Sequence, residues 1–163
     1  MSFLVAVVAV LAVLTVLNLL LSAAIIRLLN EQRRPALPAL PAAGTEIGAF
    51  EVTDADGATV TDRELDDALV AFLSPTCGPC QRIAGQLTEP AVAFVIDGGD
   101  RDAAVEYAAG LGPAVRVAFV GDRSPVAAAF GAGDVTPTLI RVRDRRITAA
   151  GHDLDAVRPQ PVR

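Results

Sequence analysis

The sequence predicts an α/β domain with a mixed sheet, preceded by one transmembrane helix. Two observations lead to this class. Residues 3–26 contain no charged residue, which is typical of a membrane-spanning helix. Beyond residue 45, short apolar runs of strand length alternate with helical segments, a pattern typical of a sheet whose strands are joined by helices.

The first 29 residues are predicted to be a membrane anchor. As a helix, residues 3–26 would extend about 36 Å, and a hydrocarbon core is about 30 Å thick. A secretory signal peptide is the alternative, but its apolar core usually has about 7–15 residues and follows basic residues. No basic residue precedes this run. We therefore expect residues 3–26 to be a single-pass anchor in contact with membrane lipid.

Three polar residues within the anchor, Thr15, Asn18 and Ser22, fall on one side of a helix. They predict either hydrogen bonds to a second transmembrane helix or bonds back to their own helix.

Residues 30–44 are predicted to be a Pro-rich linker. Pro35, Pro38 and Pro41 recur at every third position, which favours an extended polyproline II conformation. Such a spacer would hold a domain of residues 45–163 away from the bilayer.

The elements of that domain follow from turn signals and apolar runs. A hairpin is expected around Asp56-Gly57, a common turn pair, and then a helical turn capped by Thr61 or Asp62. A second hairpin around Asp144-Arg145 closes the domain. Between the two hairpins, strands are expected within residues 68–74, 91–99 and 115–122, and helices within residues 77–89, 101–112 and 124–133.

The charge balance excludes one class of partner. All 14 basic residues are arginines, against 19 acidic residues, for a net charge of −5. After residue 44 the balance is 11 arginines against 18 acids, a net of −7. A domain of this charge does not attract nucleic acid.

The only two cysteines, Cys77 and Cys80, lie between an expected strand and an expected helix. The free N–H groups and the dipole at a helix N-terminus stabilise a thiolate there. Cys77 is then a nucleophile, and Cys80, three residues on, is placed to resolve a mixed disulfide. Gly78 and Pro79 allow the tight turn between them.

Other uses of the pair are less favoured. A zinc site needs about four ligands, and the chain offers two cysteines and one histidine, His152. A purely structural disulfide gains little from closing so short a loop. Two inert buried thiols are the remaining alternative. The sequence therefore predicts a redox-active disulfide, Cys77–Cys80, with no metal and no other cofactor.

A later motif, Thr136-Pro137-Thr138, opens the second hairpin. A proline at the start of a strand can be cis. Beside the cysteines, a cis Pro137 would expose the backbone of Thr136 to an extended substrate segment. An ordinary trans proline is the alternative.

These residues carry a family resemblance. The motif TCGPC at residues 76–80, the apolar strand before it and the Thr136-Pro137-Thr138 motif resemble the thioredoxin-like fold. The leading hairpin resembles the N-terminal addition of membrane-anchored TlpA/ResA-type thiol–disulfide oxidoreductases. The anchor, its arginine-rich exit and the linker are most similar in layout to the MauD family of methylamine-utilisation proteins.

The resemblance implies an enzyme that exchanges thiols and disulfides on proteins, with Cys77 and Cys80 catalytic and Thr136 and Pro137 orienting the substrate. It implies protein substrates with disulfides or dithiols, and a membrane or soluble thiol as electron donor. The Gly-Pro dipeptide between the cysteines is similar to that of reducing thioredoxins, which favours the reductase direction. A binding module or tether that uses the fold without catalysis is the alternative.

The chain departs from this resemblance at three neighbours of the cysteines. Thr76 replaces the usual tryptophan, Ala71 the usual buried aspartate, and Ile83 the glutamate of ResA-type proteins. These departures leave the tether alternative open. Peroxiredoxins share a similar hairpin, but their threonine lies three positions before the reactive cysteine, and here Thr76 is adjacent to Cys77.

Two arguments about membrane orientation disagree. Arg27, Arg33 and Arg34 all follow the anchor, so the positive-inside rule predicts a cytoplasmic domain. The resemblance implies an extracytoplasmic domain, where disulfides persist, and large domains translocate despite flanking charge. We expect the domain on the extracytoplasmic side.

Overall fold

The computed structural model describes residues 2–32, 40–132 and 135–158. The chain divides into two compact units, residues 1–37 and 38–163. Residues 33–39 of the predicted linker, with Pro35 and Pro38, lie outside the described residues. The end of the predicted linker belongs to the folded domain, because the Gly44 N–H donates to the Ile147 carbonyl at 2.7 Å.

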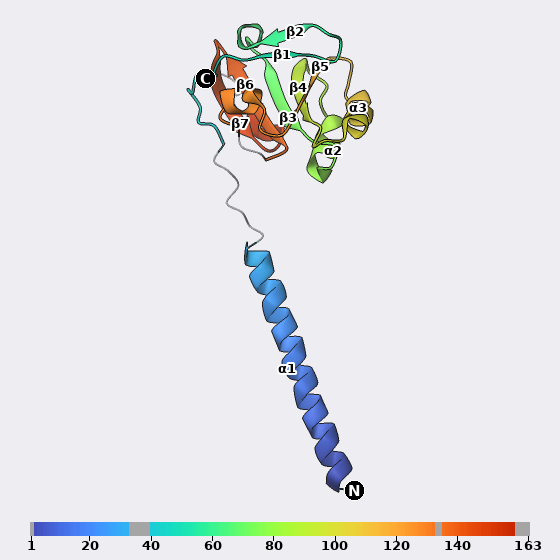
Figure 1. Ribbon diagram of the computed structural model, residues 1–163. Coiled ribbons are helices and arrows are strands. Elements are labelled where there is room, and N and C mark those ends of the chain that lie inside the picture. The colour runs from blue at the N-terminus through green and yellow to red at the C-terminus, as the bar shows by residue number, and fades with distance from the viewer. Residues whose placement is uncertain (1, 33–39, 133–134, 159–163) are drawn as a thin grey trace. The chain divides into compact units, whose positions relative to one another are not determined.

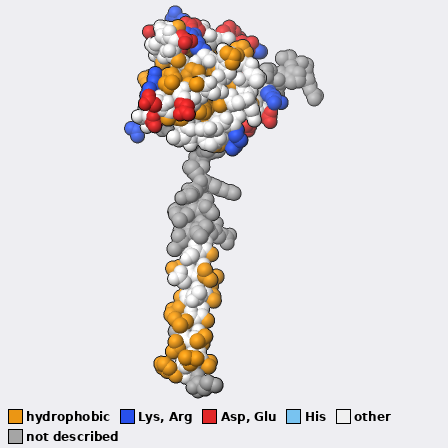
Figure 2. Space-filling model, turned by 90° about the vertical axis from the view of Figure 1, so that its right-hand side faces the viewer, with side chains coloured by type: hydrophobic (Ala, Val, Ile, Leu, Met, Phe, Trp, Pro, Cys, Tyr) orange, Lys and Arg blue, Asp and Glu red, His pale blue; other side chains and the backbone are white. Residues whose placement is uncertain are grey.

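The first unit contains a helix, α1, from Ser2 to Gln32. Its segment Phe3–Ala24 is long and apolar enough to cross a membrane, by length and composition, and an N-terminal signal sequence has the same properties. Figure 2 shows hydrophobic side chains along the visible face of this helix. Thr15 donates its hydroxyl to the Leu11 carbonyl at 2.8 Å, and the Ser22 hydroxyl lies 3.5 Å from Asn18 Oδ1. Both hydroxyls therefore bond within their own helix.

The second unit is built on a five-stranded mixed sheet in the order β5-β4-β3-β6-β7. The strands β3, β4 and β5 run parallel, whereas β6 is antiparallel to β3, and β7 to β6. The strand bounds are Leu69–Leu73 for β3, Ala91–Ile96 for β4, Val115–Val120 for β5, Thr138–Arg143 for β6 and Arg146–Gly151 for β7. The predicted order of strands and helices is confirmed.

The remaining elements connect and cover this sheet (Figure 1). A separate hairpin and the 3₁₀ turn η1 precede it, three α-helices join its strands, and the 3₁₀ turn η2 follows its last strand. These elements are β1 (Glu51–Thr53), β2 (Thr59–Thr61), η1 (Asp62–Glu64), α2 (Gly78–Ala84), α3 (Arg101–Ala109), α4 (Pro125–Ala129) and η2 (Asp155–Val157).

Two local expectations need correction. The helical turn after β2 is a 3₁₀ turn of three residues, and Thr61, the last residue of β2, takes its N-cap position without a side-chain bond. The helix that contains the second cysteine ends at Ala84, several residues before Pro90. Gly85, a poor helix former, takes its C-cap position.

The residues of β3 alternate between two cores, one on each face of the sheet. Val70 and Phe72 pack in one cluster with α4 and the β1–β2 hairpin. Leu69, Ala71 and Leu73 pack in the other, which contains Cys80 of α2 and residues of α3. All five residues of β3 are buried, which explains its uninterrupted apolar sequence.

Aromatic side chains fill the first core. The rings of Phe50, Phe72, Phe94 and Phe130 pack together, with centroids of contacting pairs 5.3 to 6.2 Å apart. On the other face the corresponding positions are small, with Ala71 and Ala93 fully buried. The small side chains leave room for α2, and so for the cysteine helix, to pack closely on the sheet.

An ion-pair network attaches the β1–β2 hairpin to the sheet edge at β5. The guanidinium group of Arg116 donates to the carboxylate of buried Asp54, to Glu64 and to the Thr59 carbonyl. Asp54 also accepts the N–H groups of Asp56 and Ala58 within the turn. The hairpin thereby covers an edge strand that would otherwise expose unpaired backbone groups.

Candidate active site

Both cysteines lie where the buried strand β3 passes into α2. Residues 74–76 make the turn, and Cys77 is the N-cap residue of the helix, with extended backbone angles of φ −93° and ψ 109°. Its Sγ accepts the backbone N–H of Cys80 at 3.3 Å. A sulfur in this position receives the bond that N-cap oxygens usually accept. The N–H group and the helix dipole would stabilise negative charge on Cys77 Sγ.

The two residues between the cysteines do not cover Cys77 Sγ. Gly78 and Pro79 are both exposed, and neither carries a long side chain. Pro79 lies in the first turn of α2, where its missing N–H costs no intrahelical bond.

Cys77 and Cys80 form a disulfide, with their Cα atoms 5.2 Å apart. Their exposure differs, because Cys77 is half-buried whereas Cys80 is fully buried in the core beneath α2. A reactant from solvent can therefore approach Cys77 Sγ, while Cys80 Sγ is reached only through its partner.

The segment before β6 meets the cysteines. The Thr136-Pro137 peptide bond is cis, the first of the two alternatives that the sequence left open. The Thr136 carbonyl oxygen lies 3.3 Å from Cys77 Sγ, although the two residues are far apart in the chain. In the dithiol form the Cys77 thiol can donate a hydrogen bond to this oxygen. Cys77, Cys80, Thr136 and Pro137 are thus gathered at one place; their roles stay predictions.

Three solved structures are similar to this domain. A thio-disulfide isomerase from Thermus thermophilus has 23% sequence identity and a TM-score of 0.53, covering 68% of this chain and 86% of its own. A secreted Mycobacterium tuberculosis disulfide oxidoreductase homologous to Escherichia coli DsbE has 17% identity and a TM-score of 0.54, covering 66% and 85%. Yeast Sco1 has 14% identity and a TM-score of 0.55, covering 70% and 86%.

The strand order, the cysteine turn and these likenesses agree. The domain has the thioredoxin fold. No protein-family profile matches the chain, and no curated protein matches it. At these identities the solved structures show the fold alone, so the finer likeness to TlpA/ResA-type and MauD proteins stays a prediction.

Within this thioredoxin fold, the neighbours of Cys80 are apolar at Ala71 and Ile83, the two positions where the resemblance described above would imply an acid. Ala71 and Ile83 are buried and pack in the same cluster as Cys80, together with Leu73 and Leu139. An apolar environment disfavours a thiolate. Cys80 is therefore a poorer nucleophile than Cys77 unless a base or water reaches it.

Tyr107 of α3 is a neighbour of the site that the sequence analysis did not single out. Its hydroxyl donates to the Cys80 carbonyl at 2.9 Å and so links α3 to the cysteine helix (Figure 1). Burial raises the pKa of Tyr107 to about 12, so the hydroxyl keeps its proton at neutral pH. Tyr107 is the only tyrosine of the chain, which makes it conspicuous in the sequence, but nothing in the local sequence indicates that it bonds to Cys80.

His152 is the second such neighbour. It was considered above only as a metal ligand, whereas its Nδ1 lies 2.7 Å from the Pro137 carbonyl oxygen. In the part of the chain that the structure describes, no three His, Cys, Asp or Glu side chains are grouped to hold a metal ion. His152 instead supports the segment that contacts Cys77.

Proposed function

We propose that this protein is a thiol–disulfide oxidoreductase that acts on protein disulfides. The observation that supports this most is the pairing of an accessible Cys77 at a helix N-cap with a buried Cys80 directly behind it. An accessible sulfur that can carry negative charge is suited to attack, and a hidden partner is suited to resolve.

In the reductive direction the reaction has two exchange steps. The Cys77 thiolate attacks one sulfur of the substrate disulfide, so that a Cys77–substrate bond forms, the substrate S–S bond breaks and the leaving thiolate takes a proton. Cys80, after losing its proton, attacks Cys77 Sγ and releases the second substrate thiol. The substrate gains two electrons and two protons, and the Cys77–Cys80 disulfide forms.

The segment at Thr136 and Pro137 orients the substrate in this proposal. The Thr136 backbone lies against Cys77 Sγ, so an extended substrate segment paired with it would bring its own sulfur to Cys77. Backbone pairing of this kind accepts many sequences, since main-chain bonds carry the affinity.

Continued turnover requires a second partner. The disulfide must be returned to the dithiol by a membrane or soluble thiol donor of lower reduction potential. We assign the reductase direction from the Gly78-Pro79 dipeptide. A measured Cys77–Cys80 reduction potential of about −270 mV supports it, whereas a value of about −120 mV makes the protein an oxidant.

The proposed location is a cell membrane, with the helix of residues 3–26 as a single-pass anchor in lipid and the domain on the extracytoplasmic side. Two experiments test this. Membrane fractionation of the full chain separates an uncleaved anchor from a cleaved signal sequence. A topology reporter fused after residue 163, active on only one side of the membrane, tests the orientation.

Trapping of mixed disulfides tests the activity. Cys80→Ser should accumulate covalent complexes with other proteins through Cys77, because resolution is removed while attack is retained. The Cys77→Ser variant is the matched control and should trap none. If neither variant forms such complexes under oxidising or reducing challenge, the domain is a non-catalytic binding module or tether instead.

A further inference from the structure

A pocket of about 140 Å³ opens beside the cysteine site, and nothing in the exchange chemistry above uses it. It lies beyond the carboxyl ends of the parallel strands β3, β4 and β5, where ligands commonly bind in open α/β sheets. Ser74 forms one side, close to the start of the cysteine turn, and Thr136 forms another. Thr136 thus belongs both to this pocket and to the surroundings of Cys77 Sγ.

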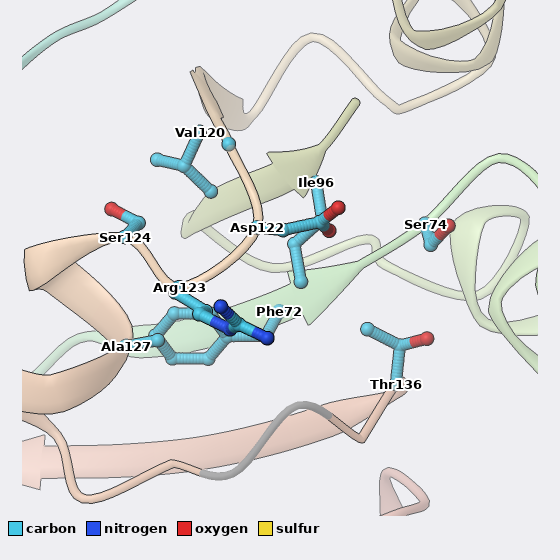
Figure 3. Close-up of a pocket in the computed structure, with 10 residues that line it drawn as sticks. Phe72, Ser74, Ile96, Val120, Asp122, Arg123, Ser124, Ala127 and Thr136 are labelled. Atoms are coloured by element: carbon cyan, nitrogen blue, oxygen red, sulfur yellow. The ribbon is translucent and has the colours of Figure 1, made fainter. Parts of the chain in front are cut away.

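The inner wall of the pocket is apolar. Phe72, Ile96, Val120 and Ala127 line it, and each comes from a different element (Figure 3). A cavity of about 150 Å³ holds a group the size of benzene. The pocket therefore fits one leucine-sized or small aromatic side chain.

The mouth of the pocket carries an arginine. Arg123 is exposed and has a left-handed backbone, with φ 58°, a conformation uncommon for a residue with a side chain. Arg123 lines the pocket together with Phe72, and Figure 3 shows both side chains among the lining residues. Other arginines of the domain, such as Arg116 and Arg141, pair with carboxylates. In the described part of the chain Arg123 has no ion pair and no side-chain hydrogen bond.

The mouth of the pocket also carries a negative charge, so its two sides differ in charge. Asp122 also lines the pocket, and in Figure 3 its carboxylate points toward the Ile96 side, away from the Arg123 guanidinium. An acidic group of a ligand is thus attracted at Arg123 and repelled at Asp122. The domain as a whole is acidic, so Arg123 is a positive charge on a pocket that Ser74 and Thr136, neighbours of the cysteine site, also line.

We propose that this pocket is a substrate subsite that receives an apolar side chain close to the reacting cysteine, and that Arg123 selects substrates with an acidic residue beside that side chain. The inference rests on the proposed function and deepens it, because it names the substrate class. Backbone pairing at Thr136 places the substrate, and the pocket and Arg123 distinguish one sequence from another.

Disulfide-bonded peptides test the proposal. The full chain, reduced and held in detergent micelles, is mixed with short disulfide-bonded peptides. In each peptide, one position within two residues of the cysteine carries leucine or alanine. The residue next to that leucine or alanine is glutamate, glutamine or lysine. Each rate is divided by the rate of the same protein with a small disulfide that has no side chain to bind. Intrinsic thiol reactivity then cancels.

We expect leucine at one position to react about tenfold faster than alanine, the discrimination that a small apolar pocket provides. Glutamate should exceed glutamine by about two- to fivefold, and this preference should fade at high salt, as for other exposed ion pairs. Arg123→Gln should abolish the glutamate preference, and Asp122→Asn should enlarge it. Ala127→Val, which narrows the pocket, should reduce the leucine preference.

The controls are matched in chemistry. Arg63→Gln removes an exposed arginine from η1, and Ala128→Val adds the same carbon atoms to an exposed position of α4; neither should change a preference. Equal rates for all peptides, with the small disulfide still reduced, overturn the subsite and leave the proposed function standing. If the reduced protein leaves the small disulfide and every peptide unchanged, the proposed function fails and the subsite falls with it.

Discussion

The Nδ1 atom of His152 lies 2.7 Å from the carbonyl oxygen of Pro137. A carbonyl oxygen only accepts hydrogen bonds, so Nδ1 carries the hydrogen and donates it. Pro137 follows Thr136, whose own carbonyl lies against Cys77 Sγ. The β7–η2 connection therefore supports the backbone segment that we propose for substrate pairing.

Replacing His152 should weaken this support. We expect His152→Ala to lower the free energy of unfolding by about 1 kcal/mol, the usual net value of a neutral hydrogen bond. It should also slow the reduction of peptide disulfides more than that of a small disulfide, because only peptides pair with the Thr136 segment. Urea unfolding and stopped-flow exchange measure the two effects.

His152→Asn is the informative companion variant, since its side-chain amide can donate to the same carbonyl. It should recover part of both losses. Equal effects on peptides and on the small disulfide would mean that His152 acts on the cysteines in another way than through the Pro137 backbone.

Tyr107 provides a prediction at alkaline pH. Burial raises its pKa from 10.0 to about 12, so the folded protein holds this proton more tightly than the unfolded chain does. The corresponding stability is fully present below pH 10 and is lost as the pH rises toward 12. The chain has no lysine and no second tyrosine, and the disulfide form has no free thiol, so few other groups obscure this range.

Tyr107→Phe should remove that alkaline loss. At neutral pH it should cost about 1 kcal/mol, because the hydroxyl no longer donates to the Cys80 carbonyl. Urea unfolding of the oxidised protein at several pH values measures both effects, and the absorbance of tyrosinate in the wild type gives the pKa directly. A tyrosine that titrates at its ordinary pKa would contradict the half-buried position of the hydroxyl and its bond to the Cys80 carbonyl.

Asp54 provides the corresponding prediction in acid. The hydrogen bond from Arg116 holds the pKa of Asp54 below its usual value of 3.8, against the effect of burial. The folded state therefore binds this proton less readily than the unfolded chain, so the stability is present above about pH 4 and is lost as the pH falls through the lowered pKa.

Asp54→Asn should destabilise the protein at neutral pH and flatten this acid dependence. Asp56→Asn, in the same turn but exposed, is the control and should leave the loss of unfolding free energy at acid pH unchanged. Urea unfolding between neutral and acid pH measures both. An unchanged loss at acid pH in Asp54→Asn would show that other carboxylates dominate acid unfolding.

Elements that local sequence determines were predicted, whereas contacts between distant residues were not, the contact of Thr136 with Cys77 being the exception. β3 was predictable because all five of its residues are buried, and the last hairpin because Asp144 and Arg145 form its turn with φ values of 49° and 58°. The links of Tyr107 to Cys80 and of His152 to Pro137 join different elements, and no local pattern encodes such a meeting. The end of α2 lies at Ala84, farther from Pro90 than expected, because Gly85, a poor helix former, follows it.

Gly151 supplies the last prediction, and it returns to the His152 segment. Gly151 ends β7 and is buried, and a Cβ added to it would overlap the Cβ of Ala156. Gly151→Ala must therefore push η2 away, at a cost of about 1–3 kcal/mol for overpacking. Since His152 is the next residue, its bond to Pro137 should be disturbed as well. Ala156→Gly removes the overlapping atom, so the double variant should recover most of the stability and the peptide-disulfide rate. In a double-mutant cycle by urea unfolding, a coupling energy near zero would contradict the steric explanation.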